Sequence, residues 1–482
     1  MRKVSNKCQV FTPPDIVEHM LDKIEYRDNL IGKKVLENSC GDGNFLVAIV
    51  TRYIQDCKRR YIPLPRIRAG LEQDICGFEL DLQHYNNCIE NLNKIAKRFD
   101  LEEVRWNVQC SDALVNTQAV SYQFVIGNPP YIAYQELDLD TRKYIRNNFQ
   151  SCSKGKPDYY YAFIESALNS LAPNGKLIYL VPSNFLKNKF SDILRKTMLP
   201  LLYEIEDYTV KKLFEKRLTS SSIIICDSAI SSDIFYYKDV NNNHIIPVQK
   251  NSLNGKWNLT ENSNLCKDEL VRFGDCFTAS APIATQLNEA FVIKEWIDDE
   301  QGLCIRCDNH IIEKTILRNA ASPKAFQSER DVRIIFPYYY NKIGLQHYNE
   351  ENLKLLFPGA YTYLLQYKDK LLSRKSDKNA NWFEFGRSQL LTHINQRKLI
   401  MSTLITNKVR IYELDTNTIP YTGICIIPKA NYTVTQALCI LNNPDFMSYI
   451  KTIGINANGT SYRISPSDVN EYRFKIDQLG EN

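Results

Sequence analysis

Residues 124–131 read Phe-Val-Ile-Gly-Asn-Pro-Pro-Tyr, an apolar run that stops at an Asn-Pro-Pro-Tyr tetrapeptide. Proline has no backbone N–H to donate to a sheet ladder, so a central strand cannot continue through Pro129 and Pro130. We therefore expect the chain to leave a sheet at Asn128. Ligands of open α/β sheets bind at the carboxyl ends of the strands, so the tetrapeptide is expected at a binding edge.

The groups in this tetrapeptide suit a flat ring that carries an exocyclic amino group. The side-chain oxygen of Asn128 and the carbonyl oxygen of Pro129 can each accept one amino hydrogen, and the ring of Tyr131 can stack on the ligand. An Asn-Pro pair after a strand is also a common turn signal. The segments that precede it in the sequence favour the binding interpretation.

A glycine turn follows an earlier short strand. Val35–Glu37 reads as that strand, and Gly41-Asp42-Gly43 turns into a helix that is expected to start near Asn44. Glycines let a backbone approach a ligand closely. The turn lacks the third glycine of a dinucleotide fingerprint and the Gly-Lys-Ser/Thr of a phosphate loop. Its acidic strand end repels phosphate but tolerates a cationic sulfonium cofactor with an amino group.

Two further strands are also followed by acids. Ile75–Phe78 ends at Glu79, and a carboxylate at that place can bind both hydroxyls of a ribose. Val108–Cys110 is followed by Asp112, which could accept a hydrogen bond from an adenine amino group. Any one of these could be an ordinary loop acid. A series of three strand-end acids followed by Asn-Pro-Pro-Tyr is a more specific pattern.

These segments resemble the gamma-class adenine-N6 DNA methyltransferases, the TaqI-like modification enzymes of restriction-modification systems. The resemblance covers the N-terminal half. It implies an α/β fold: a Rossmann-like, seven-stranded methyltransferase sheet with a separate mixed α/β target-recognition domain. It also implies S-adenosyl-L-methionine as cofactor, and methyl transfer to N6 of an adenine flipped out of duplex DNA, with no metal.

The resemblance assigns roles to individual residues. It gives catalytic roles to Asn128, Pro129, Pro130, Tyr131 and, within Leu213–Ser220, Phe214, which would hold the flipped base from its other side. The implied cofactor-binding residues are Thr12, Glu37, Ser39, Gly41, Gly43, Glu79, Leu80, Asp112, Ala113 and Asn128. In that set Thr12 would contact the methionine carboxylate, and Leu80 and Ala113 would flank the cofactor adenine. Asn38 stands where the family usually has proline.

The chain is long enough for two or three domains, with 482 residues. Residues 1–240 alternate short apolar strands with helical patterns, which is typical of a parallel sheet, and form the expected catalytic domain. Residues 241–264 are polar and are predicted to be a linker. Residues 265–482 have mixed periodicity and are expected to recognise the DNA target.

One stretch of this second half is basic and free of acids. Between Arg387 and Tyr412 the sequence contains no Asp or Glu. Cations and amides there could contact phosphates and base edges of a specific duplex sequence; the candidate DNA-binding residues are Arg387, His393, Asn395, Arg397, Lys398, Lys408 and Arg410. The aromatic run Phe336–Tyr340 supports the same interpretation. A solvated basic face with core tyrosines is the alternative.

Composition argues against several classes of protein. No apolar run approaches the ~20 residues needed to span a bilayer, and the 14 scattered cysteines suggest a reducing compartment rather than a disulfide framework. We expect a bacterial cytoplasmic, nucleoid-associated monomer. Cys304, Cys307 and His310 lack a second pair at zinc-finger spacing, which argues against a metal site. No Pro-Cys dipeptide occurs, and cytosine-C5 methyltransferases resemble one another in needing such a cysteine.

Other functions remain open at this point. Glutamine-N5 methyltransferases that act on release factors also carry Asn-Pro-Pro-Tyr, although they are shorter. An RNA methyltransferase and a DNA-binding protein with a decayed site are further alternatives. A nuclease motif of the Pro-Asp…Glu-x-Lys type with spare length around it is not found, so a cognate restriction endonuclease is expected to be a separate protein.

Overall fold

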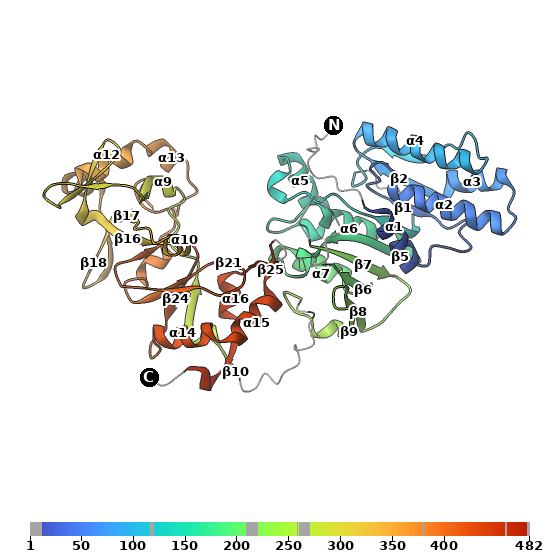
Figure 1. The fold of residues 1–482 in the computed structure, drawn as a ribbon. Coiled ribbons are helices and arrows are strands. Elements are labelled where there is room, and N and C mark those ends of the chain that lie inside the picture. The colour runs from blue at the N-terminus through green and yellow to red at the C-terminus, as the bar shows by residue number, and fades with distance from the viewer. Residues whose placement is uncertain are drawn as a thin grey trace. The chain divides into compact units, whose positions relative to one another are not determined.

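The computed structural model describes residues 12–115, 120–208, 220–257, 259, 270–377, 380–457 and 460–479. The chain divides into two compact units, Met1–Ser263 and Asn264–Asn482 (Figure 1). The hydrophobic clusters of the first unit draw on residues between Ile16 and Leu259. Those of the second unit draw on residues between Phe273 and Phe474, so each unit has a core of its own.

The first unit is built on a nine-stranded sheet with the order β3-β2-β1-β4-β5-β7-β6-β8-β9. Its strands are β1 (Val35–Glu37), β2 (Ile75–Glu79), β3 (Asn107–Cys110), β4 (Tyr122–Gly127), β5 (Leu171–Pro182), β6 (Leu202–Asp207), β7 (Ser221–Asp227), β8 (Ile234–Asp239) and β9 (His244–Gln249). β1 to β5 are parallel to one another, and β7 lies antiparallel between β5 and β6.

Two of these nine strands extend the expected seven-stranded sheet. β8 pairs in parallel with β6, and β9 pairs antiparallel with β8 from Ile234↔Gln249 to Asp239↔His244. The predicted linker over residues 241–264 is therefore wrong for residues 244–249. The sequence favours a linker here because the three residues before this strand, Asn241, Asn242 and Asn243, are polar. They form the tight turn of a hairpin, in which the Asp239 carboxylate accepts the N–H groups of Asn241 and Asn242.

Helices cover both faces of the sheet because successive strand residues point to opposite sides. Val35 packs with one face and Leu36 with the other, and Ile178 and Tyr179 of β5 divide in the same way. The helices that pack on the face of Val35 are α1 (Pro14–Lys23), α2 (Asn44–Arg59), α3 (Leu64–Asp74) and α4 (Leu82–Arg98). The opposite face carries α5 (Leu139–Asn148), α6 (Tyr160–Asn169) and α7 (Asp192–Met198).

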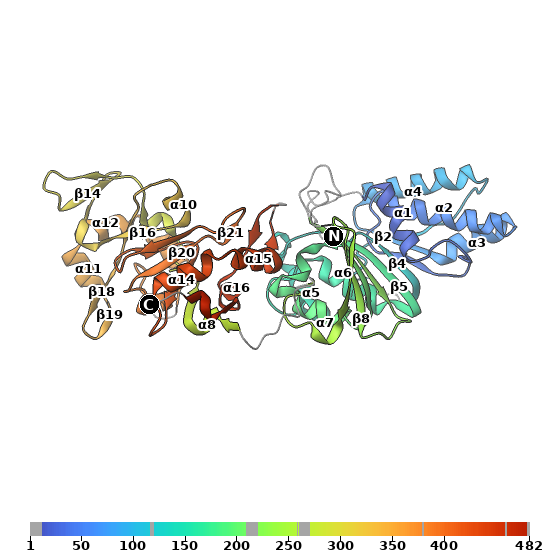
Figure 2. The same cartoon turned by 60° about the horizontal axis from the view of Figure 1, so that its bottom comes forward.

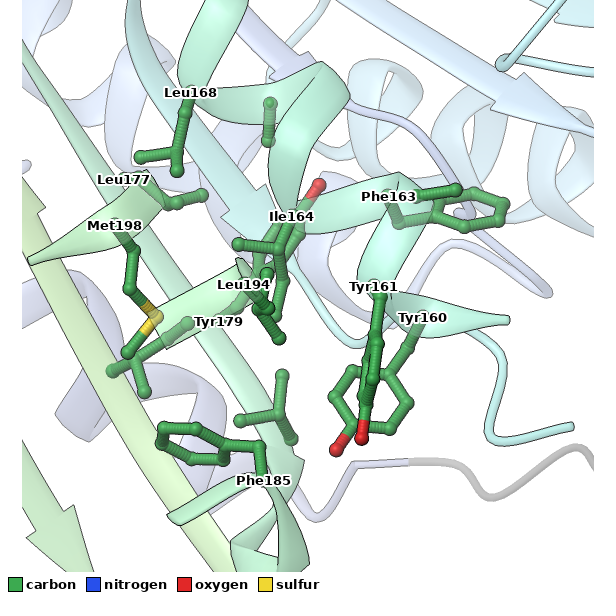
Figure 3. Packing of buried hydrophobic residues seen from close by; sticks show 14 of the residues in the cluster. Tyr160, Tyr161, Phe163, Ile164, Leu168, Leu177, Tyr179, Phe185, Leu194 and Met198 are labelled. Carbon is green, nitrogen blue, oxygen red and sulfur yellow. The ribbon is translucent and has the colours of Figure 1, made fainter. Parts of the chain in front are cut away.

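The core under α6 is aromatic at its lower end (Figure 3). Tyr160 and Tyr161 are almost fully buried, and their rings meet edge to face at 4.8 Å between centroids. Tyr160 donates its hydroxyl hydrogen to the side-chain oxygen of Asn184 at 2.8 Å. These tyrosines belong to the core and support the residues of the strand edge described below.

The described residues of the second unit form six small sheets. Figure 2 shows these sheets together with short helices. Its strands are β10 (Leu270–Arg272), β11 (Phe277–Ser280), β12 (Val292–Ile293), β13 (Ile297–Asp298), β14 (Cys304–Cys307), β15 (His310–Glu313), β16 (Leu317–Ala321), β17 (Arg333–Ile335), β18 (Tyr338–Asn341), β19 (Gly344–His347), β20 (Lys398–Met401), β21 (Leu404–Ile405), β22 (Ile411–Leu414), β23 (Ile419–Pro420), β24 (Ile424–Pro428), β25 (Ile455–Asn456), β26 (Tyr462–Arg463) and β27 (Arg473–Lys475). Its helices are α8 (Phe273–Cys276), α9 (Asn288–Phe291), α10 (Pro323–Gln327), α11 (Glu350–Leu356), α12 (Pro358–Leu365), α13 (Lys368–Leu372), α14 (Val434–Asn442), α15 (Pro444–Ile453) and α16 (Pro466–Asn470).

The two sheets with the most strands in this unit have four strands each. One has the order β11-β24-β20-β22 and the other β12-β17-β16-β23.

Among the residues that the structure describes, no helix combines the length and apolarity needed to cross a membrane.

Candidate active site

The parallel strands β1, β2 and β4 end at one edge of the first unit's sheet. The register pairs Glu37 with Gly77, and Leu36 with Val125, so the residues after Glu37, Glu79 and Gly127 emerge on the same side. This is the carboxyl edge at which α/β sheets bind ligands. The strand ends that the sequence predicted are therefore neighbours in space.

Glu79 connects the end of β2 to the glycine turn. One carboxylate oxygen accepts the backbone N–H of Gly41 at 2.8 Å, and the other accepts that of Asp81 at 2.8 Å. The side chain is almost fully buried. Each oxygen can accept more than one hydrogen bond, so these contacts fix the carboxylate and leave it capacity for a hydroxyl ligand.

Gly43 begins α2 in a conformation that favours glycine. Its φ is 87°, and a Cβ atom at this position would lie 2.7 Å from the Cys88 sulfur. Two side chains of α4 contact the Asp42 carboxylate of the same turn. The His84 ring lies 2.7 Å from this carboxylate, and the Asn87 side chain donates to it at 3.0 Å. Sequence reasoning missed His84 and Asn87, which position the turn without belonging to a motif.

Asn38, the departure from the family pattern, has a buried partner of its own. The Tyr179 hydroxyl of β5 donates to the Asn38 side-chain oxygen at 2.6 Å. This bond crosses from β1 to β5 past the intervening strand β4. It gives the turn an anchor at the position where the resembling family has the rigidity of proline.

Asn128 lies at the junction of three segments. Its side-chain nitrogen donates to the Thr12 hydroxyl at 3.1 Å, and its backbone carbonyl accepts from the Ser39 hydroxyl at 3.2 Å. The Thr12 carbonyl in turn accepts from the Asn44 side chain at 3.3 Å. The structure thus places Thr12, Ser39 and Asn128 together.

Tyr131 is held by both its hydroxyl group and its ring. The hydroxyl donates to the Leu180 carbonyl of β5 at 2.8 Å, and the ring meets Tyr160 edge to face at 6.2 Å between centroids. Burial of the hydroxyl raises the pKa of Tyr131 well above 10. The phenol is therefore neutral at physiological pH.

The remaining predicted residues are less closely connected. Asp112 accepts the N–H of Leu114 at 3.0 Å, which shapes the turn after β3. Asp112, Ala113 and Leu80 are half-buried near the ends of β3 and β2, and their contact with a cofactor ring stays a prediction. Phe214 lies outside the described residues, so its role stays a prediction.

The chemistry of this edge fits a cationic cofactor. Glu37 is 1% exposed, and one of its carboxylate oxygens has no hydrogen-bond partner in the described part of the chain. Burial is the main reason that the pKa of Glu37 is raised well above its ordinary value, and electrostatic contributions from Cys88 and Glu79 add to it. An ammonium group or a sulfonium beside these acids would offset that cost.

The basic stretch of the second unit differs from its prediction at Lys398. Its side chain is fully buried at the start of β20, where the ammonium donates to the carbonyls of Gln396, Asp415 and Thr416 at 3.0, 2.6 and 3.4 Å. It therefore cannot reach a DNA phosphate. Lys398 follows the exposed Arg397 in the sequence, but it is the first residue of β20, and all four residues of that strand are buried.

Arg397 is exposed, but it has an acidic partner that lies outside the acid-free stretch of sequence. It forms an ion pair with Glu413 of β22, which pairs with β20. Arg387, His393, Asn395, Lys408 and Arg410 are exposed. Their contact with DNA stays a prediction.

Lys398 gives a testable pH dependence of stability. Burial lowers the pKa of Lys398 from 10.5 to about 8 in the folded chain. Between these two pH values the side chain is therefore protonated in the unfolded chain and neutral in the folded chain. Stability should then rise with pH across this window. Measured by reversible denaturation under reducing conditions, the unfolding free energy of the native chain relative to Lys398→Met should increase by about 2 kcal/mol from pH 7.5 to 9.5. A pH-independent difference would show that the buried amine does not titrate there.

Residues 55–214 match the family model described as Eco57I restriction-modification methylase. The type II methyltransferase M.BstVI of Geobacillus stearothermophilus is 30% identical over 223 residues, which cover 44% of this chain and 38% of that protein. The restriction enzyme and methyltransferase RM.Eco57I of Escherichia coli is 24% identical over 375 residues, 67% of this chain and 37% of that protein. The chain thus spans about two fifths of the length of these curated relatives.

Similarity also extends into the second unit. The type II methyltransferase M.HincII of Haemophilus influenzae is 23% identical over 427 residues, covering 82% of this chain and 72% of that protein. Among solved structures, the type IIL restriction-modification enzyme MmeI in complex with DNA has a TM-score of 0.60 and 14% identity, over 95% of this chain and 65% of that one. At that identity the likeness shows a shared fold.

Proposed function

We propose that this chain is a site-specific DNA methyltransferase that transfers a methyl group from S-adenosyl-L-methionine to N6 of an adenine flipped out of duplex DNA. The observation that carries the proposal is the junction at Asn128, which joins Thr12 and Ser39 beside the Glu79–Gly41 contact. The match to a restriction-modification methylase family and the similarity to type II methyltransferases support it.

The cofactor would be held along the carboxyl edge of the sheet. Glu79 would accept the ribose hydroxyls, Thr12 would contact the methionine carboxylate, and the acidic surroundings of Glu37 suit its amino group. Asp112 with Leu80 and Ala113 would receive the adenine ring. When bound, S-adenosylmethionine supplies a methyl group on a positively charged sulfur.

Asn128 and Pro129 would act directly on the target amino group. The Asn128 side-chain oxygen and the Pro129 carbonyl each accept one hydrogen of the adenine amine, which draws the nitrogen toward tetrahedral geometry and makes its lone pair available. The bond from the Asn128 nitrogen to Thr12 fixes the amide orientation in advance. Such preorganised polar groups contribute through positioning and electrostatics.

The target adenine must first leave the duplex. Extrusion costs a few kcal/mol, and stacking on an aromatic ring is worth roughly 1–3 kcal/mol per base. Tyr131 is already fixed by Leu180 and Tyr160, so it loses little freedom when a base stacks on it. Phe214 would cover the other side of the base.

The second unit would supply target recognition, in line with the fold shared with the DNA complex of MmeI over most of the chain. In this proposal the protein is the modification component of a type II system, acting as a monomer on DNA in the bacterial cytoplasm. A separate endonuclease would cut the same site when it is unmodified.

The substrate class is tested by measuring which macromolecule receives a labelled methyl group. The purified chain is incubated with S-adenosylmethionine labelled in its methyl group and with equal masses of adenine-unmethylated plasmid, total RNA and bacterial release factor. We expect label in the plasmid alone. Label in the release factor would indicate glutamine-N5 chemistry, and label in RNA would indicate an RNA methyltransferase, so either result would overturn the proposal.

Glu79→Gln should weaken cofactor binding. The amide keeps the side-chain shape, but its NH2 group cannot accept a hydrogen bond, so the variant loses a charged acceptor for the ribose hydroxyls and one of the two contacts to the backbone N–H groups of Gly41 and Asp81. We expect the dissociation constant for S-adenosylmethionine, measured by calorimetry, to rise about tenfold. Glu90→Gln is the matched control, because Glu90 lies exposed on α4 and pairs only with Lys94 among described residues. Equal affinities for the two variants would contradict the ribose role of Glu79.

A further inference from the structure

The ring of Tyr131 has one rotation that its own hydroxyl bond does not restrict. The hydroxyl donates to the Leu180 carbonyl at 2.8 Å, which fixes the far end of the side chain. Because the hydroxyl oxygen lies on the long axis of the ring, this bond permits the ring to turn about that axis, and this torsion of a tyrosine is intrinsically broad. A base stacks on a ring face, so the angle about this axis decides whether Tyr131 can receive one.

The ring of Tyr160 restricts that angle. The centroids of the Tyr131 and Tyr160 rings are 6.2 Å apart and their planes meet at 70°, which is the edge-to-face arrangement that aromatic pairs favour. Tyr160 is 1% exposed, and Tyr161 packs edge to face against its ring. The Tyr131 ring therefore takes its angle from a neighbour that is itself held in the core.

Asn184 fixes the Tyr160 ring from the next strand end. It lies in the short 3-10 helix η3 (Ser183–Leu186), which directly follows β5. The Tyr160 hydroxyl donates to the Asn184 side-chain oxygen at 2.8 Å. Since β5 runs parallel to β4 as its neighbour, η3 and the Asn128–Tyr131 motif both follow the carboxyl ends of adjacent strands. Asn184 thus lies at the same edge of the sheet as the candidate active site.

Asp158 holds the Asn184 amide in one orientation. Its carboxylate accepts a long hydrogen bond of 3.4 Å from the Asn184 side-chain nitrogen, and this assigns the amide oxygen to the tyrosine hydroxyl. The backbone N–H of Tyr134 hydrogen-bonds to the same carboxyl group. The next residue, Tyr159, donates its N–H to the Ile132 carbonyl at 2.9 Å. Asp158 therefore connects η3 to the segment that follows the Asn-Pro-Pro-Tyr motif.

A carboxyl group at this place lowers the stability of the fold. Burial raises the pKa of Asp158 and the charge of Glu136 adds to the rise, while the bonds from Asn184 and Tyr134 oppose it. An uncharged side chain would avoid the cost of desolvating a carboxylate. A charged acceptor, however, forms stronger hydrogen bonds than a neutral one, so the acid orients Asn184 more firmly. Ionisable groups that are shifted in this way occur preferentially at functional sites.

We propose that Asp158, Asn184 and Tyr160 are positioning residues for the flipped target base, and that they act by setting the angle of the Tyr131 ring before the base arrives. The inference rests on the proposed function, because it assumes that a base stacks on Tyr131. The three residues need no contact with DNA. They remove in advance a rotation that Tyr131 would otherwise lose when the base binds.

The test is a double-mutant cycle on DNA binding with full-length variants. Tyr160→Phe removes the hydroxyl and keeps the ring, and Asn184→Ala removes the acceptor of that hydroxyl. Each is measured alone and together with Tyr131→Ala. The duplex carries the site modified by the native chain, identified by sequencing, with an abasic position opposite the target adenine so that extrusion costs little. Cofactor affinity and thermal unfolding check that each variant is folded.

Tyr53→Phe and Asn188→Ala are the matched controls. Tyr53 of α2 is also a fully buried tyrosine, and its hydroxyl donates to the Asp74 carboxylate on the opposite face of the sheet. Asn188 lies just after η3, where its side chain accepts the N–H of Phe190 at 3.0 Å. These bonds do not belong to the series that leads from Asp158 to Tyr131. Both controls should bind the duplex like the native chain.

We expect Tyr160→Phe and Asn184→Ala each to weaken binding about fivefold, which is part of the stacking contribution of one base, and to have no effect in the Tyr131→Ala background. With a duplex that lacks the target base, both variants should match the native chain. Equal weakening in both backgrounds, or native affinity in both variants, would overturn the inference alone. A native chain that leaves DNA unmethylated would instead overturn the proposed function.

Discussion

Replacing Asn128 by alanine is expected to slow methyl transfer by at least about 100-fold. The side-chain oxygen is assigned to the reacting amino group, so the loss should fall on the chemical step rather than on binding. Single-turnover methylation with saturating DNA and cofactor measures that step. Cofactor affinity should change little, because Thr12 keeps its contact with Asn44.

Asn443→Ala is the matched control for this variant. Asn443 also precedes a proline, but its side chain accepts the N–H of Asp445 and caps α15. Its loss should cost about 1 kcal/mol of stability and leave the single-turnover rate unchanged. If the Asn128 variant transferred methyl groups as fast as this control, the assigned mechanism would be wrong.

Removing the second unit is expected to abolish sequence-specific binding. A fragment that ends at Ser263 keeps both hydrophobic clusters of the first unit, including Trp257 and Leu259. It should bind S-adenosylmethionine like the full chain. Its affinity for the specific duplex should fall by about 1,000-fold or more, the usual gap between specific and non-specific binding.

The readout for this fragment is the set of modified plasmid sites, compared with the full chain at equal cofactor saturation. Intact cofactor binding serves as the control for folding. Should the fragment modify the same motif as the full chain, target recognition would belong to the first unit.

The strand ends could be predicted because they are encoded locally. A short apolar run followed by an acid or by Asn-Pro fixes where each strand stops, and parallel pairing then brings Glu79 and Asn128 to one edge. Asn443-Pro444 follows no such apolar run with an acid at its end, and it opens helix α15 instead of ending a strand.

Contacts between distant segments could not be predicted from these patterns. The bond from Tyr179 to Asn38 joins residues 141 positions apart, and neither residue belongs to a recognisable motif beyond the glycine turn. The burial of Lys398 is also hidden in the sequence, because it depends on β22 and β24, which pair with β20 on its two sides. The acid that pairs with Arg397 likewise lies on a different strand.

The most direct test of the central claim is the identity of the methylated nucleoside. Adenine-unmethylated duplex DNA is incubated with the purified chain and S-adenosylmethionine, digested to nucleosides and analysed by mass spectrometry. The account predicts N6-methyl-2′-deoxyadenosine as the sole new product, formed at least about 100-fold more slowly by the Asn128→Ala variant. A methylated cytosine, or unmodified DNA from a chain that binds both the cofactor and duplex DNA, would contradict it.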